Sequence, residues 1–142
     1  MKTFYTSCWG RSKSFPAGRQ IVQISSTKSR FLGKLETTFT PDLVPWTFGQ
    51  KLPADVWKPA YQRQLESLHA QGKVERIISS LQDGAILCCY EGDANDCHRT
   101  VLANFLTENG LAAVQELIVP NKNAAASAAK MVKKASEQIL LF

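Results

Sequence analysis

The sequence GAILCCYEGDANDCHRTVLANFL, residues 84–106, contains the pattern from which the architecture of this chain follows. Ala85 to Tyr90 is a continuous apolar run between a glycine and a polar turn, which is typical of a β-strand covered on both faces. Asn95 or Asp96 can then cap a helix, whose apolar residues recur at helical spacing until Gly110. These residues therefore predict a central strand, a short turn and a helix.

The segments on either side of this pattern predict further strands and helices. β-Branched, aromatic and apolar runs predict strands over residues 2–7, 20–25 and 111–119, and apolar residues at helical spacing predict helices over 54–70 and 74–81. Strands that alternate with helix-length connections predict an α/β fold of three layers. We expect a mainly parallel, open, Rossmann-like sheet with helices on both faces.

Two segments fall outside this alternation. Residues 28–53 are rich in proline and glycine and predict an ordered loop with one short helix, in which four aromatic side chains need burial: Phe31, Phe39, Trp46 and Phe48. Residues 121–142 are rich in alanine and predict a helical extension that ends on the apolar run Ile139 to Phe142. We expect this extension to dock on the single α/β domain of residues 1–120 or on a second subunit, which would make a homodimer.

Length and composition limit the class of protein. A chain of 142 residues with 44% apolar and 20% charged residues is long enough for one hydrophobic core. No segment has the apolar length of a membrane span, and the first residues lack the apolar core of a secretory signal. We therefore expect a cytoplasmic protein that binds no membrane. The formal net charge of +5 permits a phosphate-bearing small molecule or nucleic acid as partner without requiring one, since the basic residues are scattered.

The candidate site lies where the predicted strands end. In an open parallel sheet the functional crevice forms beyond the C-terminal ends of the strands, next to the helix N-termini. Polar, thiol and charged side chains from three strands and one helix are expected to meet there: Thr6, Ser7 and Cys8, then Ser25 and Ser26, then Cys89 and Glu91, and finally Cys97, His98 and Arg99.

The helix that begins at Cys97 determines the chemistry of this group. Its unpaired backbone amides and its dipole, together with Arg99, suit a phosphate or carboxylate, and the same field favours the thiolate of Cys97. Glu91 is placed to act as a base or to orient His98. The candidate catalytic residues are therefore Cys97, His98 and Glu91, and the candidate ligand-binding residues are Arg99, Cys89, Thr6, Ser7 and Ser25.

Other interpretations of the same residues stay open. All four cysteines are expected to be free thiols in a cytosolic chain. Cys88 and Cys89 point to opposite faces of their strand and are expected in the core. Arg99 could pair with Glu91 as a structural bridge. A metal site made from the cysteines, histidine and glutamate is disfavoured, because neighbouring residues at a helix start point in different directions, so no metal or cofactor is expected. His69 on the first long helix is expected to be incidental.

The segment from Ile86 to Leu106 resembles the bacterial and phage proteins grouped as domain of unknown function 488. The similarity rests on an apolar strand ending in cysteine, an aromatic residue and glutamate, followed six residues on by the triplet Cys97-His98-Arg99 at a helix start. Phe4 to Ser7 and Ile24-Ser25 are similar to the first two strands of a short branch of that family. The arginine and prolines usual after the second strand are absent, and Lys28 or Arg30 could supply the missing charge. The resemblance implies a fold and a site, and no defined activity.

Three functions are compatible with these residues. The leading hypothesis is a protein that binds a phosphorylated or nucleotide-like ligand, or nucleic acid, at the Cys97-His98-Arg99 helix start, with His98 as an acid or base. The second is a non-catalytic interaction protein that sequesters a nucleotide signal or inhibits a host protein. The third is a thiol-dependent redox or transfer enzyme that uses Cys97 with Cys89 as its partner.

Overall fold

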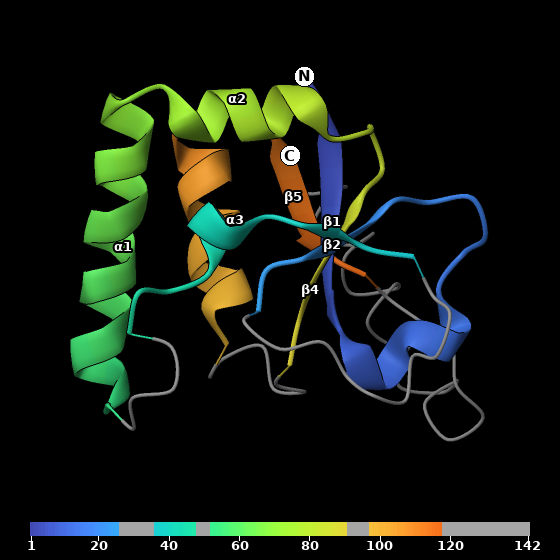
Figure 1. The fold of residues 1–142 in the computed structure, drawn as a ribbon, viewed down its shortest axis with the longest axis horizontal. Coiled ribbons are helices and arrows are strands. Elements are labelled where there is room, and N and C mark those ends of the chain that lie inside the picture. Colours follow the sequence, from blue (N-terminus) through green and yellow to red (C-terminus); the bar gives the residue numbers. More distant parts are fainter. Residues whose placement is uncertain (26–35, 48–51, 91–96, 118–142) are drawn as a thin grey trace, which may run out of the picture.

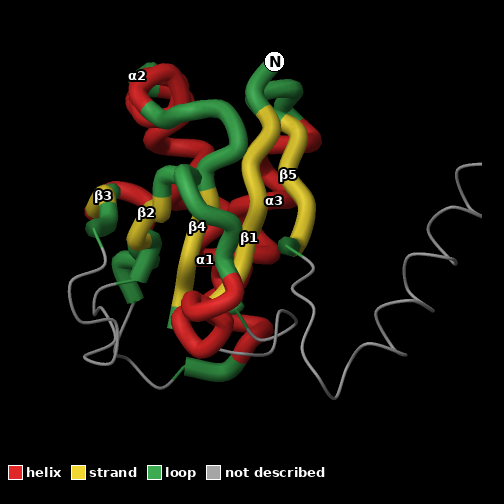
Figure 2. The backbone as a smooth tube through the Cα atoms, turned by 90° about the vertical axis from the view of Figure 1, so that its right-hand side faces the viewer, coloured by secondary structure: helices red, strands yellow, loops and turns green. Residues whose placement is uncertain are grey.

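A computed structural model describes residues 1–25, 36–47, 52–90 and 97–117 of the chain. Figure 1 shows the fold as a ribbon. It contains a five-stranded sheet in the order β3-β2-β4-β1-β5, which can be followed in Figure 2, and every paired strand is parallel to its neighbour. The strands are β1 (Thr3–Cys8), β2 (Ile21–Gln23), β3 (Thr38–Phe39), β4 (Ile86–Cys89) and β5 (Ala113–Glu116). The apolar strand expected at the centre of the sheet is β4, and it is confirmed there.

Helices lie on both sides of this sheet, as the sequence predicts. The helical segments are η1 (Trp9–Ser14), η3 (Pro41–Leu43), α1 (Ala54–Ala70), α2 (Lys73–Ser80) and α3 (His98–Glu108). α1 and α3 contact each other and lie together behind the sheet in Figure 2, whereas the short η1 covers the opposite face. The three-layer α/β fold is therefore confirmed.

The long helices form where local sequence favours them. α1 has the predicted bounds, Ala54–Ala70, and a left-handed glycine, Gly72 with φ of 72°, separates it from α2. A residue with a side chain would be strained in that conformation, so glycine permits the abrupt change of direction between the two helices. α2 then crosses near the start of β1, where the Nζ of Lys2 donates to the carbonyls of Ile78, Ser79 and Leu81.

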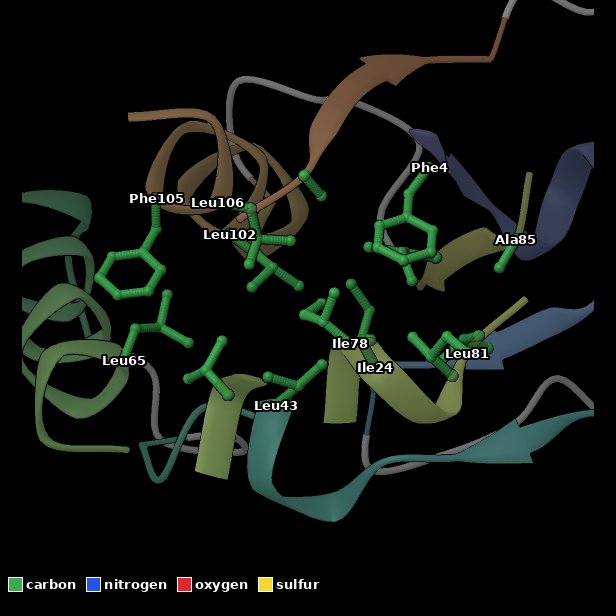
Figure 3. Close-up of a cluster of buried hydrophobic side chains, with 14 of the residues drawn as sticks. Phe4, Ile24, Leu43, Leu65, Ile78, Leu81, Ala85, Leu102, Phe105 and Leu106 are labelled. Atoms are coloured by element: carbon green, nitrogen blue, oxygen red, sulfur yellow. The ribbon is translucent and has the colours of Figure 1, made fainter. Parts of the chain in front are cut away.

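The two faces of the sheet have separate hydrophobic cores. The larger core packs strand residues such as Phe4 against α1 and α3, including Leu65, Leu102 and Phe105 (Figure 3). The smaller core lies beneath η1 and contains Trp9, Ile21, Ile86, Cys88 and Leu117. Cys89 belongs to the larger core and Cys88 to the smaller one, which confirms that these neighbours point to opposite faces.

Some expectations outside the core are wrong. Residues 28–53 were expected to form a loop with one short helix. A short helix, η3, is present, but the described part of this segment also contains the two-residue strand β3. The expected burial of Phe39 and Trp46 is also wrong, because both side chains are more than half exposed. Phe31 and Phe48 lie outside the described residues.

The remaining predictions concern the ends of the chain. The helical extension of residues 121–142 lies outside the described residues, together with the candidate charges Lys28 and Arg30. β5 is shorter than the predicted strand 111–119, and Gly110, with φ of 66°, separates it from α3 as expected. None of the helices in the described part of the chain combines the length and apolar character needed to cross a membrane.

Candidate functional site

The helix-side face of the sheet brings together one part of the predicted site. At the C-terminal ends of β1, β4 and β5, the start of α3 packs beside the sheet, and its first residues are buried with the strand residues they contact. We call this group the thiol–arginine cluster; its members are Thr6, Cys89, Cys97, His98, Arg99 and Glu116. Five of these residues were predicted, and Glu116 was not.

Cys97 is the N-cap of α3. Its backbone is extended, with φ of −114° and ψ of 141°, and its Sγ accepts a hydrogen bond of 3.5 Å from the backbone N–H of Arg99. The predicted caps Asn95 and Asp96 lie outside the described residues, and the cap that the structure assigns is the cysteine. The sulfur therefore satisfies one of the amides that the helix start would otherwise leave unpaired.

Cys97 is also bonded to Cys89. The two sulfur atoms form a disulfide between the end of β4 and the start of α3, with Cα atoms 7.3 Å apart. The expectation that all four cysteines are free thiols is wrong for this pair, because the strand end and the helix cap point their side chains at each other. It is confirmed for Cys8 and Cys88, which are free and buried.

The guanidinium group of Arg99 is fully buried and has a partner for each nitrogen. Its Nη1 donates to the Sγ of Cys89 at 3.0 Å, whereas Nε and Nη2 reach the two carboxylate oxygens of Glu116 at 3.2 and 3.0 Å. This is the two-pronged geometry in which arginine binds carboxylates most strongly. The bridge to Glu91 that the sequence left open lies outside the described residues, and the carboxylate found on Arg99 comes from β5 instead.

Glu116 links three elements of the fold. Besides Arg99, its carboxylate accepts a hydrogen bond of 2.6 Å from the Oγ1 of Thr6 on β1 and one of 3.3 Å from Arg11 on η1. Thr6 and Glu116 are aligned partners in the parallel ladder between β1 and β5. Sequence reasoning missed Glu116 because its position depends on which strand β5 joins and in which register, and no local pattern states either.

His98 is buried with a defined arrangement of its two nitrogens. Its Nε2 lies 2.5 Å from the carbonyl oxygen of Ile24, and since a carbonyl can only accept, Nε2 carries a proton. In the neutral form of the ring, the other nitrogen, Nδ1, then has a lone pair, and it lies 3.9 Å from the Sγ of Cys97. Tyr61 packs edge-on against the ring, with ring centroids 5.6 Å apart, and burial raises the pKa of this tyrosine far above its usual range. The Nδ1 of His98 thus faces the sulfur of Cys97.

Ser7 and Ser25 lie on the opposite face of the sheet from Arg99. The Nε1 of Trp9 donates to the Oγ of Ser25 at 3.2 Å, which places this serine beneath η1. Ser7 is aligned with Cys88, and its buried hydroxyl has no hydrogen-bond partner among the described residues. These two serines therefore face away from the thiol–arginine cluster, because alternation along a strand sends neighbouring side chains to different faces. Glu91 and Ser26 lie outside the described residues.

Two further predictions concern metal ligands and His69. Within the part of the chain that the structure describes, no group of three or more His, Cys, Asp or Glu side chains has the arrangement of a metal site. His69 pairs with Glu75 across the junction of α1 and α2, and its ring packs edge-on against Phe105 at 5.7 Å between centroids. These contacts give His69 a structural role.

Comparison with known proteins identifies a family and nothing more specific. The family model described as domain of unknown function DUF488 matches residues 32–106, more than half of the chain. This match includes β4, the start of α3 and the residues Cys89, Cys97, His98 and Arg99, whereas Thr6 and Glu116 lie outside it. No curated protein and no solved structure matches the chain. From the matched segment and its parallel α/β fold, we conclude that the chain belongs to the DUF488 family.

Proposed function

We propose that the thiol–arginine cluster is a thiol–disulfide exchange site, in which Cys89 and Cys97 alternate between a disulfide and two thiols. The observation on which this proposal rests is the contact of the two sulfurs with each other inside a group that also contains a guanidinium and an imidazole. Buried cysteines that serve packing alone need no charged neighbours. The third hypothesis from the sequence is therefore the one that this geometry favours.

The positive charges of the cluster stabilise the reduced state. After reduction, the Nη1 of Arg99 remains directed at Cys89, and the N-terminus of α3 remains directed at Cys97. A cation and a helix N-terminus both favour a thiolate over a thiol, and the thiolate is the nucleophile in exchange reactions. Arg99 and the helix start therefore act on different sulfurs of the same pair.

His98 provides the proton transfer. Because its Nε2–H is held by the carbonyl of Ile24, its Nδ1 can accept the proton of the Cys97 thiol and return it. Tyr61 and the surrounding apolar residues hold the ring in this orientation. His98 is the candidate acid and base of the exchange.

The reaction is a two-electron exchange with a thiol partner. A thiolate of the partner attacks one sulfur of the Cys89–Cys97 bond, so that a mixed disulfide forms and the other cysteine leaves as a thiolate. A second thiolate of the partner then attacks the mixed disulfide, and both cysteines are reduced while the partner becomes a disulfide. Running the steps backwards oxidises the pair and reduces a disulfide partner.

Alkylation mapping of the full chain tests this proposal. The oxidised protein is treated with or without dithiothreitol, then with iodoacetamide at pH 7, and each cysteine is quantified by peptide mass analysis. We expect Cys89 and Cys97 to be protected before reduction and alkylated after it, and to be protected again once oxidised glutathione is added. Cys88→Ser, which changes the neighbour on the opposite face, is the matched control and should behave like the wild type. Independent alkylation of both cysteines in the untreated protein would refute the proposal.

A second candidate function is the anion binding that the sequence favoured. Its specific support is that Arg11 and Arg99 both donate to the carboxylate of Glu116, whose side chain is 34% exposed. An anionic ligand could exchange with this carboxylate between the two guanidinium groups. We expect inorganic phosphate to raise the melting temperature of Glu116→Gln more than that of the wild type. Arg11→Gln, which removes one of the two guanidinium groups, is the control, and its melting temperature should not rise with phosphate. Equal shifts in all three proteins would exclude this site.

The nature of such a ligand would then separate catalysis from sequestration. A nucleotide that is recovered intact after the protein is denatured indicates a binding protein, whereas a nucleotide that is consumed indicates an enzyme. The first outcome corresponds to the interaction protein that the sequence left as an alternative.

A further inference from the structure

We propose that Cys8 is a third reacting thiol of the same site, which takes over Cys89 from Cys97 by disulfide exchange. This inference rests on the proposed function and adds a catalytic residue to it. Cys8 is free, buried and located at the last position of β1. The site would then contain two alternative disulfides that share Cys89.

The alignment of two central strands places Cys8 beside Cys89. In the parallel ladder between β1 and β4, the Cα of Cys8 is the partner of the Cα of Cys89. Neighbouring strands lie about 4.8 Å apart, which is inside the usual range of about 4.4–6.8 Å between the Cα atoms of a disulfide. Cys89 therefore has a second cysteine within bonding reach, from a part of the chain 81 positions away from it.

The side chain of Cys8 faces the thiol–arginine cluster. Thr6, two residues earlier on β1, binds Glu116 in that cluster, and side chains two positions apart in a strand point to the same face. The aligned pair of Thr6 is Leu87, which lies in the larger core together with Cys89. Cys8, Cys89 and Cys97 thus share one face of the sheet.

Cys88 is not the reacting neighbour. It points to the opposite face, into the core beneath η1. Burial, and the nearby Cys8 to a smaller extent, raise the pKa of its thiol far above the usual range, so that it stays protonated. Since a protonated thiol is a poor nucleophile, Cys88 serves as an internal control for the other three cysteines.

The exchange step is internally balanced. The thiolate of Cys8 attacks the Sγ of Cys89, a Cys8–Cys89 bond forms, and the Cys89–Cys97 bond breaks with its electron pair on the Sγ of Cys97. The proton lost by Cys8 ends on Cys97, which the Nδ1 of His98 faces. No external oxidant or reductant is needed, because one disulfide and one thiol are present before and after the step. The step frees the cap of α3 while the site stays oxidised.

Two double variants test whether Cys8 reacts with Cys89. Cys88→Ser with Cys97→Ser keeps only Cys8 and Cys89, and Cys88→Ser with Cys89→Ser keeps only Cys8 and Cys97. Each full-length protein is incubated with oxidised glutathione, which accepts the two electrons and becomes reduced glutathione, and is then quenched in acid for mass analysis. We expect the first variant to lose two hydrogen atoms without gaining glutathione. The second, matched variant should gain glutathione or stay unchanged.

A further measurement keeps this test independent of variant folding. In oxidised Cys88→Ser, acid quenching and peptide mapping should find both Cys89–Cys97 and Cys8–Cys89 disulfides. If mapping finds only the Cys89–Cys97 disulfide in this protein, and the first double variant carries glutathione adducts, the role of Cys8 is overturned and the proposed function stays intact. If mapping finds neither disulfide, both proposals are overturned.

Discussion

Replacing Glu116 by glutamine should destabilise the protein through a residue that it contacts, the buried Arg99. Glutamine has nearly the same shape as glutamate but offers one oxygen acceptor instead of two, and it has no charge. The guanidinium of Arg99 has no exposed surface, so water cannot replace the lost acceptor on the buried side. The substitution therefore leaves a buried cation with a neutral partner.

The size of the effect follows from burial of the two partners. Removing one partner of a fully buried ion pair costs about 3–5 kcal/mol. Glu116 is 34% exposed and also receives Arg11 from the solvent side, so water reaches part of this site and lowers the cost. We expect a loss of about 2 kcal/mol, which for a chain of this length corresponds to a melting temperature lower by about 6 °C.

Urea denaturation of the reduced proteins measures this effect without a contribution from the disulfide. Arg11→Gln is the matched control, because it removes an exposed pair to the same carboxylate and should change stability by about 0.5 kcal/mol or less. A double-mutant cycle with Arg99→Met should give a coupling energy of at least about 1 kcal/mol with Glu116→Gln. If Glu116→Gln is as stable as Arg11→Gln, the buried charge does not depend on Glu116 and the reasoning is wrong.

Three further perturbations have expected outcomes. Thr6→Val removes the hydroxyl that donates to Glu116 at 2.6 Å and should cost about 1 kcal/mol in urea denaturation, with no loss if the carboxylate is held by the arginines alone. His98→Phe keeps a ring beside Tyr61 but leaves the carbonyl of Ile24 without its donor, so it should cost about 1–3 kcal/mol, and a smaller loss would show that water reaches this carbonyl. Because the pKa of Cys88 is raised in the folded state, the free energy of unfolding should fall as the pH rises above the ordinary thiol value of 9.0, where only the unfolded state loses the proton. Cys88→Ala should remove that part of the pH dependence.

Local patterns in the sequence predicted the elements better than their arrangement. α1 was predicted with its bounds because proline, an apolar helical period and a glycine all mark the same segment. β4 was predicted as the central strand because its residues are apolar on both faces. The two-residue strand β3 has no such pattern: it exists because β2 offers a free edge, and its Phe39 stays exposed.

For the candidate site, too, local sequence patterns predicted what lies in one segment, and the arrangement of the strands decided the rest. Cys97, His98 and Arg99 could be recognised together because they are consecutive at a predicted helix start. Glu116 could not, since it reaches Arg99 through strand order and register, which depend on the whole sheet. Ser7 and Ser25 were grouped with the site by their place at the strand ends, and they lie on the other face because direction alternates along each strand.

The order of the strands also means that residues 32–106, which match the family model, cannot form the thiol–arginine cluster by themselves. Residues 32–106 contain β3, β4 and most of α3, but β4 lies between β2 and β1, and neither neighbour is in the matched segment. Without β1 and β5, Arg99 would lose Glu116, and Cys89 would lose the aligned Cys8. A buried guanidinium without a carboxylate is costly, so this segment cannot keep Arg99 in its observed position by itself. The observed arrangement of the cysteines, histidine and arginine of the matched segment therefore requires the first and last strands of the sheet.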